Sequence, residues 1–222
     1  MATKLTLQSI DPVTHDTYHL VFAKPDGFDF KPGQAAGLSL DEKGWRDEDR
    51  PFTMTSLPSD PTLEFVIKSY PDHDGVTEKI PNMKIGDQMF LDGPFGAITD
   101  HGTGTFIAGG AGITPFIAIL KKQMRDGKSG SHLIFANEKD ADIIMKPMWD
   151  TMEGLTTTYV ISDQDDTAHR KGQIDADLLK DVVTNTDQPF YICGPGGMVD
   201  QVRDALKDMG VDDDKIITED GW

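Results

Sequence analysis

Apolar and polar positions alternate in short segments over the first part of the chain. Segments such as TLEFVIKSY (62–70) and DQMFLDGP (87–94) are separated by Pro, Gly and Asp. Alternation with a period of two predicts β-strands, and short strands joined by such turn residues are typical of an antiparallel barrel or sandwich. We therefore expect an antiparallel β domain up to residue 98.

The second part of the chain has a different pattern, because strand-like and helix-like segments alternate there. Apolar residues recur at helical spacing over 113–124, and Gly127 is expected to end that helix. Pro147 is expected to interrupt or kink a second helical stretch. Strand–helix alternation predicts a parallel sheet covered on both faces. The chain is therefore predicted to have two domains, 1–98 and 102–222.

Composition narrows the class of protein. The 222 residues carry a formal net charge of −17, which argues against binding to nucleic acid or to anionic membrane surfaces. The sequence has no apolar run of about eighteen residues and no apolar signal segment at its N-terminus, so we expect no membrane insertion and a cytoplasmic location. The single cysteine excludes a disulfide framework and a cluster held by four thiolates, and no metal site is expected. If the protein handles electrons, its redox centre must be an organic cofactor or belong to a partner.

The segment AGGAGITPF (108–116) joins a predicted strand to a predicted helix. Backbone N–H groups and the helix dipole favour a phosphate there, and glycines such as Gly110 and Gly112 allow a ligand to approach closely. The segment departs from the standard dinucleotide fingerprint, because Pro115 stands where a third glycine is expected. These residues alone leave a phosphate cradle and a merely structural turn both open.

The segment YICGPGGM (191–198) follows another predicted strand, at the edge where ligands bind in doubly wound sheets. Cys193 is interpreted either as a small buried apolar side chain or as a thiol beside the reactive ring of a bound nucleotide. The local sequence has no histidine to activate it, so a thiolate nucleophile is disfavoured.

The first domain offers three further candidates. RPFT (50–53) combines a cation, an aromatic ring and a hydroxyl. GVT (75–77) precedes a short predicted helix and is either a plain N-cap or the holder of a diphosphate. Lys68 ends a predicted strand, where it is either a surface charge or, in so acidic a chain, a phosphate ligand.

In their order along the chain, these segments resemble the ferredoxin–NADP reductase superfamily of flavoprotein reductases, in particular its small members without an iron–sulfur module. RPFT is similar to the family's flavin signature, and GGAGITP and CGPGGM are similar to its nicotinamide-nucleotide motifs. FVIK (65–68), GVT and DGPFG (92–96) match further elements. The resemblance covers nearly the whole chain. It implies an N-terminal six-stranded antiparallel β-barrel that holds FAD and a C-terminal α/β domain with a five-stranded parallel sheet that holds NAD(P)H.

The resemblance also implies roles for individual residues. Arg50 would pair with the flavin phosphates, Phe52 would lie against the isoalloxazine, and Thr53 would bond near N5, the atom that accepts hydride. Cys193 would help to place the nicotinamide C4. The implied flavin-binding residues are Arg50, Pro51, Phe52, Thr53, Val66, Ile67, Lys68, Gly75, Val76 and Thr77. The implied nicotinamide-nucleotide residues are Gly110, Gly112, Thr114, Ser162, Asp163, Cys193, Gly194, Pro195 and Met198.

Two residues near the C-terminus bear on catalysis. Trp222 resembles the final aromatic residue with which many family members shield the flavin, and a frayed end is the alternative. Glu219 lies near the C-terminal acid that plant-type members use in proton delivery, although its register differs. With Thr53 and Cys193, Glu219 completes the candidate catalytic residues. The family usually has Tyr where Phe52 stands, so the hydrogen bond of a phenol is missing.

The choice between NADH and NADPH depends on the residues after the third strand of the second domain. NADPH-preferring relatives commonly carry Arg after the Ser that ends this strand, whereas here Asp163 follows Ser162. A carboxylate would repel a 2′-phosphate and accept a hydrogen bond from a ribose hydroxyl. Arg170 and Lys171 would favour NADPH if they folded back. We expect NADH to be the preferred donor.

The predicted function is that of an FAD-dependent NAD(P)H oxidoreductase. It would pass electrons to a protein acceptor such as ferredoxin, flavodoxin or an oxygenase component, and a monomer is expected. Two alternatives stay open: a free-flavin reductase, and a non-catalytic electron-transfer subunit of a larger complex. FMN in place of FAD is also open, because the loop that contacts adenine is not readable from the sequence.

Overall fold

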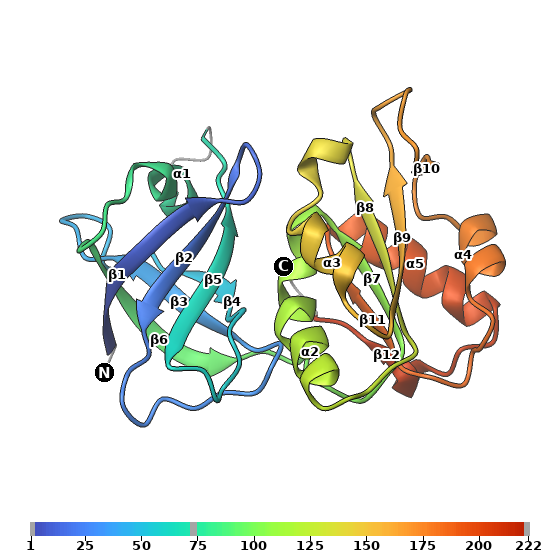
Figure 1. Cartoon of the computed structure of the whole chain (residues 1–222), viewed down its shortest axis with the longest axis horizontal. Helices are drawn as coiled ribbons and strands as arrows, with labels where there is room; N and C mark the ends of the chain where they lie inside the picture. The colour runs from blue at the N-terminus through green and yellow to red at the C-terminus, as the bar shows by residue number, and fades with distance from the viewer. Residues whose placement is uncertain (1–2, 72–74, 220–222) are drawn as a thin grey trace. The chain divides into compact units, whose positions relative to one another are not determined.

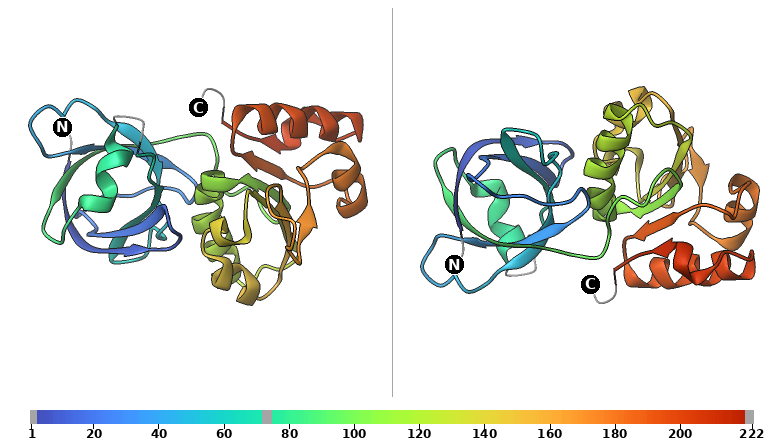
Figure 2. Two further views of the ribbon diagram at one scale, coloured as in Figure 1. Left: turned by 90° about the horizontal axis from the view of Figure 1, so that it is seen from above. Right: turned by 90° about the horizontal axis from the view of Figure 1, so that it is seen from below.

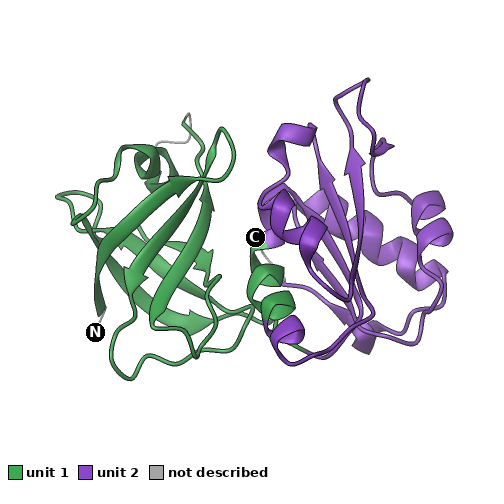
Figure 3. Ribbon diagram, viewed as in Figure 1, with its two compact units in different colours: residues 1–100, 114–121 green, residues 101–113, 122–222 purple. Residues whose placement is uncertain are grey.

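A computed structural model describes residues 3–71 and 75–219 of the chain (Figure 1). The chain divides into two compact units (Figure 3). Unit 1 contains Met1–Asp100 and Thr114–Lys121, and unit 2 contains His101–Ile113 and Lys122–Trp222. Each unit has a sheet and a hydrophobic core of its own.

Unit 1 is built on six antiparallel strands in the spatial order β4-β3-β6-β1-β2-β5. The chain that leaves β4 meets β5 through a bridge between Met54 and Phe65, and the Thr55 N–H donates to the Glu64 carbonyl (2.8 Å). This contact closes the sheet, so the predicted six-stranded antiparallel barrel is confirmed. The strands are β1 (Thr3–Pro12), β2 (Thr17–Ala23), β3 (Ala35–Leu40), β4 (Arg50–Thr53), β5 (Thr62–Lys68) and β6 (Gln88–Phe95).

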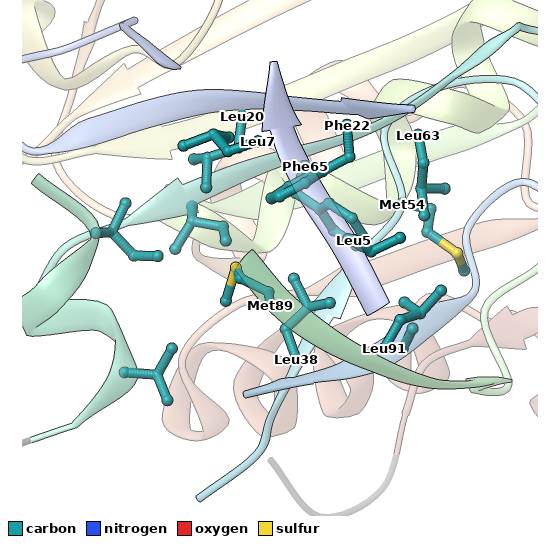
Figure 4. Close-up of a cluster of buried hydrophobic side chains, with 14 of the residues drawn as sticks. Leu5, Leu7, Leu20, Phe22, Leu38, Met54, Leu63, Phe65, Met89 and Leu91 are labelled. Carbon is teal, nitrogen blue, oxygen red and sulfur yellow. The ribbon is translucent and has the colours of Figure 1, made fainter. Parts of the chain in front are cut away.

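The core of unit 1 fills the inside of the barrel. Alternate residues of a strand point to the same side, so the apolar positions of the period-two pattern converge there. Helix α1 (Val76–Lys79) and the 3-10 helix η1 (Ile80–Asn82) lie over one end of the barrel, and Val76 and Ile80 are fully buried in the same core (Figure 2). The residues of this core that are labelled in Figure 4 are Leu5, Leu7, Leu20, Phe22, Leu38, Met54, Leu63, Phe65, Met89 and Leu91.

Unit 2 contains a parallel sheet in the order β10-β9-β8-β7-β11-β12. The predicted parallel sheet is confirmed, but the expected number of five strands is wrong. The sixth strand is β10, a pair of exposed charged residues that runs beside β9. It was not predicted because it has no pattern of apolar residues. The strands are β7 (Thr105–Gly109), β8 (Ser131–Asn137), β9 (Leu155–Ile161), β10 (Arg170–Lys171), β11 (Phe190–Cys193) and β12 (Ile216–Ile217).

Helices cover the sheet of unit 2 on opposite faces (Figures 1 and 2). Helices α4 (Ala176–Val182) and α5 (Gly196–Asp208) pack on one face, against a core that includes residues of β7, β8, β9 and β11. On the other face, α3 (Lys146–Thr151) packs on β9, and its buried Trp149 donates from Nε1 to the Ile144 carbonyl (2.8 Å).

Pro147 does not interrupt a helix, so that prediction is wrong. It stands in the first turn of α3, where the missing proline N–H breaks no hydrogen bond within the helix. Helix α2 (Thr114–Arg125) matches the predicted helix, and the Gly127 N–H bonds to the Met124 carbonyl at its end (3.0 Å).

The segment that follows β6 is tied into unit 2 from His101 onward. The Gly102 carbonyl accepts hydrogen bonds from Gln123 Nε2 and from the Tyr191 hydroxyl, both at 2.8 Å. The same hydroxyl accepts from the His101 N–H (2.8 Å), and the Tyr191 ring stacks on Phe106 at 4.1 Å between centroids. The second half of the expected connection is thus a fixed part of unit 2.

Within residues 3–71 and 75–219, no helix combines the length and the apolar character needed to cross a membrane.

Candidate functional site

The RPFT segment forms the edge strand β4, which pairs antiparallel with β3. Arg50 is exposed, and its guanidinium donates to the Asp49 carbonyl (2.7 Å) and to the Glu48 carboxylate (3.4 Å). Phe52 is half-buried and packs against the core of the barrel, and Pro51 and Thr53 are also half-buried. The strand therefore presents a cation, part of an aromatic face and a hydroxyl at the surface of unit 1.

Lys68, at the end of β5, forms an ion pair with Asp16 (3.1 Å). Burial of Asp16 raises its pKa, but hydrogen bonds from Lys68, Thr14 and Thr17 outweigh this and hold the pKa below its ordinary value. A phosphate would have to share this ammonium with a carboxylate. The contact with Asp16 was not predicted, because Asp16 lies far from Lys68 along the chain. Val66 and Ile67 of the same strand are buried.

The GVT segment begins the short helix α1. Gly75 is its N-cap with extended backbone, Val76 is buried and Thr77 is half-buried. The first N–H groups of a helix have no partner within the helix, which suits an anion. Near the other end of this helix, the Lys79 ammonium lies 5.2 Å from the ring centroid of Trp45, which packs against the barrel core.

In unit 2, the two glycine-rich motifs meet at the carboxyl edge of the sheet. Strands β7 and β11 are neighbours, with Cys193 opposite Ala108, and the 3-10 helix η2 (Gly110–Ile113) follows β7 directly. A Cβ atom on Gly112 would lie 2.2 Å from the Cys193 carbonyl oxygen, so only glycine fits there. Thr114 then begins α2.

Gly194 is another position in these motifs where only glycine fits. Its φ of +156° is rarely adopted by other residues, and a Cβ there would lie 2.7 Å from Met198 Cε and 3.0 Å from the Gly109 nitrogen. Pro195 precedes α5 as its N-cap. The motifs at 108–116 and 191–198 are therefore packed closely against each other at the carboxyl edge of the sheet.

The thiol of Cys193 is protonated at neutral pH. Burial raises its pKa to about 12, the nearby Glu219 carboxylate raises it as well, and a backbone hydrogen bond from Gly194 only partly opposes them. Cys193 is therefore suited to neutral contact and not to nucleophilic attack. Glu219 lies close enough for its charge to raise the pKa of this thiol. Trp222 lies outside the described residues.

Ser162 and Asp163 follow β9 at the same edge of the sheet. The Ser162 N–H donates to the Asn137 carbonyl (3.1 Å) and the Asp163 N–H to the Glu138 carbonyl (2.8 Å), so both continue the pairing of β9 with β8. The side chain of Asp163 is exposed. Strand β9 is two strands away from β7, or about 10 Å, which is within the span of a dinucleotide.

The two cations that could reverse the choice of nucleotide are engaged by carboxylates. Arg170 forms an ion pair with Asp181, and Lys171 lies 3.5 Å from Asp165.

Asn137, a polar residue at this edge, is not among the residues predicted from the sequence. Asn137 ends β8 and is buried, and neither side-chain polar atom has a hydrogen-bond partner among the described residues. The available signal was an amide directly after the apolar stretch LIFA (133–136).

Two sequence profiles match the chain. The oxidoreductase FAD-binding domain family matches residues 4–99, within the barrel and its exit. The oxidoreductase NAD-binding domain family matches residues 106–204, which include both glycine-rich motifs.

Proteins with similar sequences include reductases. The chain is 26% identical over 227 residues to the ferredoxin–NAD(P)(+) reductase component of the naphthalene 1,2-dioxygenase system of Pseudomonas putida, covering 97% of this chain and 68% of that protein. It is 30% identical over 177 residues to NADH-cytochrome b5 reductase 1 of Candida glabrata, covering 72% and 62%. The chain thus spans about two thirds of the length of these relatives.

A solved structure shares the fold. A ferredoxin NADP+ reductase from Neisseria gonorrhoeae, with bound FAD and NADP, matches with a TM-score of 0.85 at 22% identity and covers 100% of this chain and 99% of that one. The barrel, the parallel sheet with its two motifs and the consecutive FAD- and NAD-binding profiles all agree with this likeness. The chain belongs to the ferredoxin–NADP reductase superfamily.

Proposed function

We propose that the protein is an NAD(P)H-dependent flavoprotein oxidoreductase that passes electrons to a protein acceptor. The observation that carries this proposal is the presence, in one chain, of an FAD-binding profile on a barrel and an NAD-binding profile on a sheet whose glycine-rich motifs converge at its carboxyl edge. In the proposed division, residues 1–98 bind FAD and residues 102–222 bind the nicotinamide nucleotide.

The flavin would be held by the surface of unit 1. Arg50 is exposed, and its planar guanidinium is able to bond bidentately to a phosphate. Phe52 would cover part of the ring, and Thr53 would offer a hydroxyl. The first turn of α1 would supply backbone N–H groups at Val76 and Thr77. FAD, when bound, takes two electrons as a hydride and releases them singly.

The nicotinamide nucleotide would be held at the carboxyl edge of the sheet in unit 2. Gly110 and Gly112 would let the protein backbone approach the ligand closely, with Thr114 beside them. Gly194, Pro195 and Met198 would form the adjoining wall. The protonated thiol of Cys193 would contact the ring, and Glu219 would hold a charge or a proton beside that thiol.

The acceptor proposed is a ferredoxin, a flavodoxin or an oxygenase component. Support comes from the Pseudomonas putida relative, which is described as the reductase component of a dioxygenase system.

The experiment that tests the cofactor proposal compares Arg50→Ala with Arg46→Ala, in the same part of the chain. The purified protein should be yellow and should bleach when NADH is added without oxygen. Arg50→Ala should weaken FAD binding by at least tenfold. Arg46→Ala removes only the ion pair of Arg46 with Asp41 and should leave FAD binding unchanged. Protein that binds no flavin after reconstitution would refute the proposal, and loss of flavin on dialysis would favour a free-flavin reductase.

We further propose that Asp163 selects NADH over NADPH. Its exposed carboxylate would repel a 2′-phosphate and accept a hydrogen bond from the ribose hydroxyl, while Asp181 and Asp165 engage Arg170 and Lys171. Replacement of Asp163 by Ser should raise kcat/KM for NADPH relative to NADH by about tenfold or more. An unchanged ratio would exclude this role.

A further inference from the structure

The β9–β10 loop, residues 162–169, has the sequence SDQDDTAH and connects β9 with β10. It carries Asp163, together with Asp165 and Asp166, and all three side chains are exposed. Like charges this close repel one another, so the loop tends to spread unless other contacts fix it. The backbone bonds of Ser162 to Asn137 and of Asp163 to Glu138 fix its first two residues.

Asp140, on the neighbouring segment, holds Gln164 and Thr167 of the loop, and Lys171 lies 3.5 Å from Asp165. Asp140 begins the 3-10 helix η3 (Asp140–Asp142), shortly after β8. One oxygen of its carboxylate accepts from Gln164 Nε2 (3.0 Å), and the Asp140 N–H donates to Gln164 Oε1 (3.0 Å). The other oxygen accepts from the Thr167 hydroxyl (2.7 Å), and that hydroxyl accepts from the His169 N–H (3.1 Å).

This arrangement, the Asp140 clamp, consists of Asp140, Gln164 and Thr167. It holds the loop at two points, with Asp165 and Asp166 between them. Gln164 is the direct neighbour of Asp163, so its two bonds to Asp140 restrict where the Asp163 carboxylate can lie. All three clamp residues are partly buried, which makes their hydrogen bonds stronger than those of fully exposed groups.

We infer that Asp140 is a positioning residue for the choice between NADH and NADPH, acting on Asp163 through Gln164 and Thr167. This inference rests on the proposed role of Asp163. A carboxylate discriminates best when its charge stays at the position that a 2′-phosphate would occupy. Without the clamp, the carboxylates of the loop spread apart and the repulsion is averaged over many positions.

The test uses variants that keep the charge of the loop unchanged. Thr167→Val and Gln164→Leu each remove clamp hydrogen bonds, Thr167→Ser retains the hydroxyl, and Thr184→Val is the control at an exposed threonine outside the loop. For each full-length variant, kcat and KM are measured with NADH and with NADPH. Binding of adenosine 5′-monophosphate and adenosine 2′,5′-bisphosphate is measured by calorimetry, and hydrogen exchange reports on the amides of 162–169.

We expect Thr167→Val and Gln164→Leu to raise the NADPH:NADH ratio of kcat/KM by about three- to tenfold, through KM and not kcat. The bisphosphate should bind more tightly by a similar factor, and the His169 amide should exchange faster. Thr167→Ser and Thr184→Val should behave like the parent protein.

The outcomes separate this inference from the role of Asp163. If Asp163→Ser relaxes the discrimination but neither clamp variant does, the clamp inference is overturned and the role of Asp163 stands. Equal effects of Thr167→Val and Thr167→Ser would also overturn it, because the hydroxyl would then be irrelevant. If Asp163→Ser has no effect, the role of Asp163 fails and the inference fails with it.

Discussion

Cys193 and Glu219 form a pair in which a carboxylate opposes ionisation of a half-buried thiol. We expect the thiol to react slowly with a disulfide reagent between about pH 7 and pH 9, because the thiolate is the reactive form. Glu219→Gln removes the negative charge and lowers the pKa of Cys193, so the reaction should accelerate by up to about tenfold for each pKa unit. The measurement is the release of the chromophore of the reagent over time.

The control for this pair is Glu153→Gln, at an exposed position in unit 2. It should leave the rate unchanged. A reaction in the parent protein that titrates near pH 8.5, as for an ordinary thiol, would contradict the description of the site.

Gly112 and Gly197 lie in the two glycine-rich motifs but in opposite circumstances. A side chain on Gly112 meets the Cys193 carbonyl, whereas one on Gly197 meets no atom within 4 Å and lies in α5. Gly112→Ala should lower the free energy of unfolding by about 1–3 kcal/mol or more. Gly197→Ala should leave it unchanged or raise it by up to about 1 kcal/mol. Urea unfolding measures both, and equal effects would mean that η2 moves away freely.

At the scale of elements, Glu64 forms a contact between two strands of the barrel whose contribution to stability depends on pH. His19 Nε2 on β2 lies 3.1 Å from the Glu64 carboxylate on β5, and the Thr62 hydroxyl donates to it at 2.9 Å. The hydrogen bond with His19 is the largest cause that lowers the pKa of Glu64 to about 2, against the opposing effect of burial.

A carboxyl with a lowered pKa in the folded state stabilises the protein above its unfolded pKa of about 4.5. This stability is lost as the pH falls from there through about 2. Glu64→Gln should therefore lower the free energy of unfolding by roughly 2–3 kcal/mol at neutral pH and by much less near pH 2. Denaturant unfolding at both pH values checks this, with the exposed Glu42→Gln as the control. An equal loss at both values would point to lost packing instead.

The elements predicted well were those with a long, regular pattern. Helix α2 and its end at Gly127 followed from helical spacing and one glycine, and the barrel strands followed from alternation. The prediction for Pro147 was wrong because a proline indicates a helix boundary but does not indicate on which side of it the helix lies. Here the backbone turns at Met145 with a φ of +56°, and the helix starts at the next residue. Strand β10 has too few residues to carry any pattern.

For the candidate site, sequence order located the segments but not the contacts between them. The proximity of the motifs at 108–116 and 191–198 was expected, because both follow parallel strands. The pairing of Lys68 with Asp16 and the Asp140 clamp were not expected. Both join residues whose spacing along the chain follows no helix or strand period.

At the scale of the whole molecule, the net charge of −17 should govern encounters with charged acceptors. If the protein has the proposed activity, its rate constant for reducing ferricyanide should rise with salt, because screening weakens the repulsion between two anions. The rise should be seen from about 10 mM to 100 mM salt, where the Debye length falls from about 30 Å to about 10 Å. Stopped-flow absorbance measures the rate, and an uncharged quinone is the control.

A rate with ferricyanide that falls with salt would contradict this expectation. It would mean that basic residues are concentrated where the acceptor approaches, as expected for reductases that bind acidic proteins.

The tryptophans offer an optical label for each unit. Trp149 of unit 2 is buried with its indole N–H bonded to a carbonyl, whereas Trp45 of unit 1 is partly buried beside a lysine. The two indoles should thus differ in fluorescence emission, the enclosed one being bluer. In a Trp222→Phe background, single Trp→Phe replacements at 45 and 149 would leave one reporter at a time. Melting followed by each reporter would tell whether the barrel and the sheet unfold as one cooperative body or in two stages.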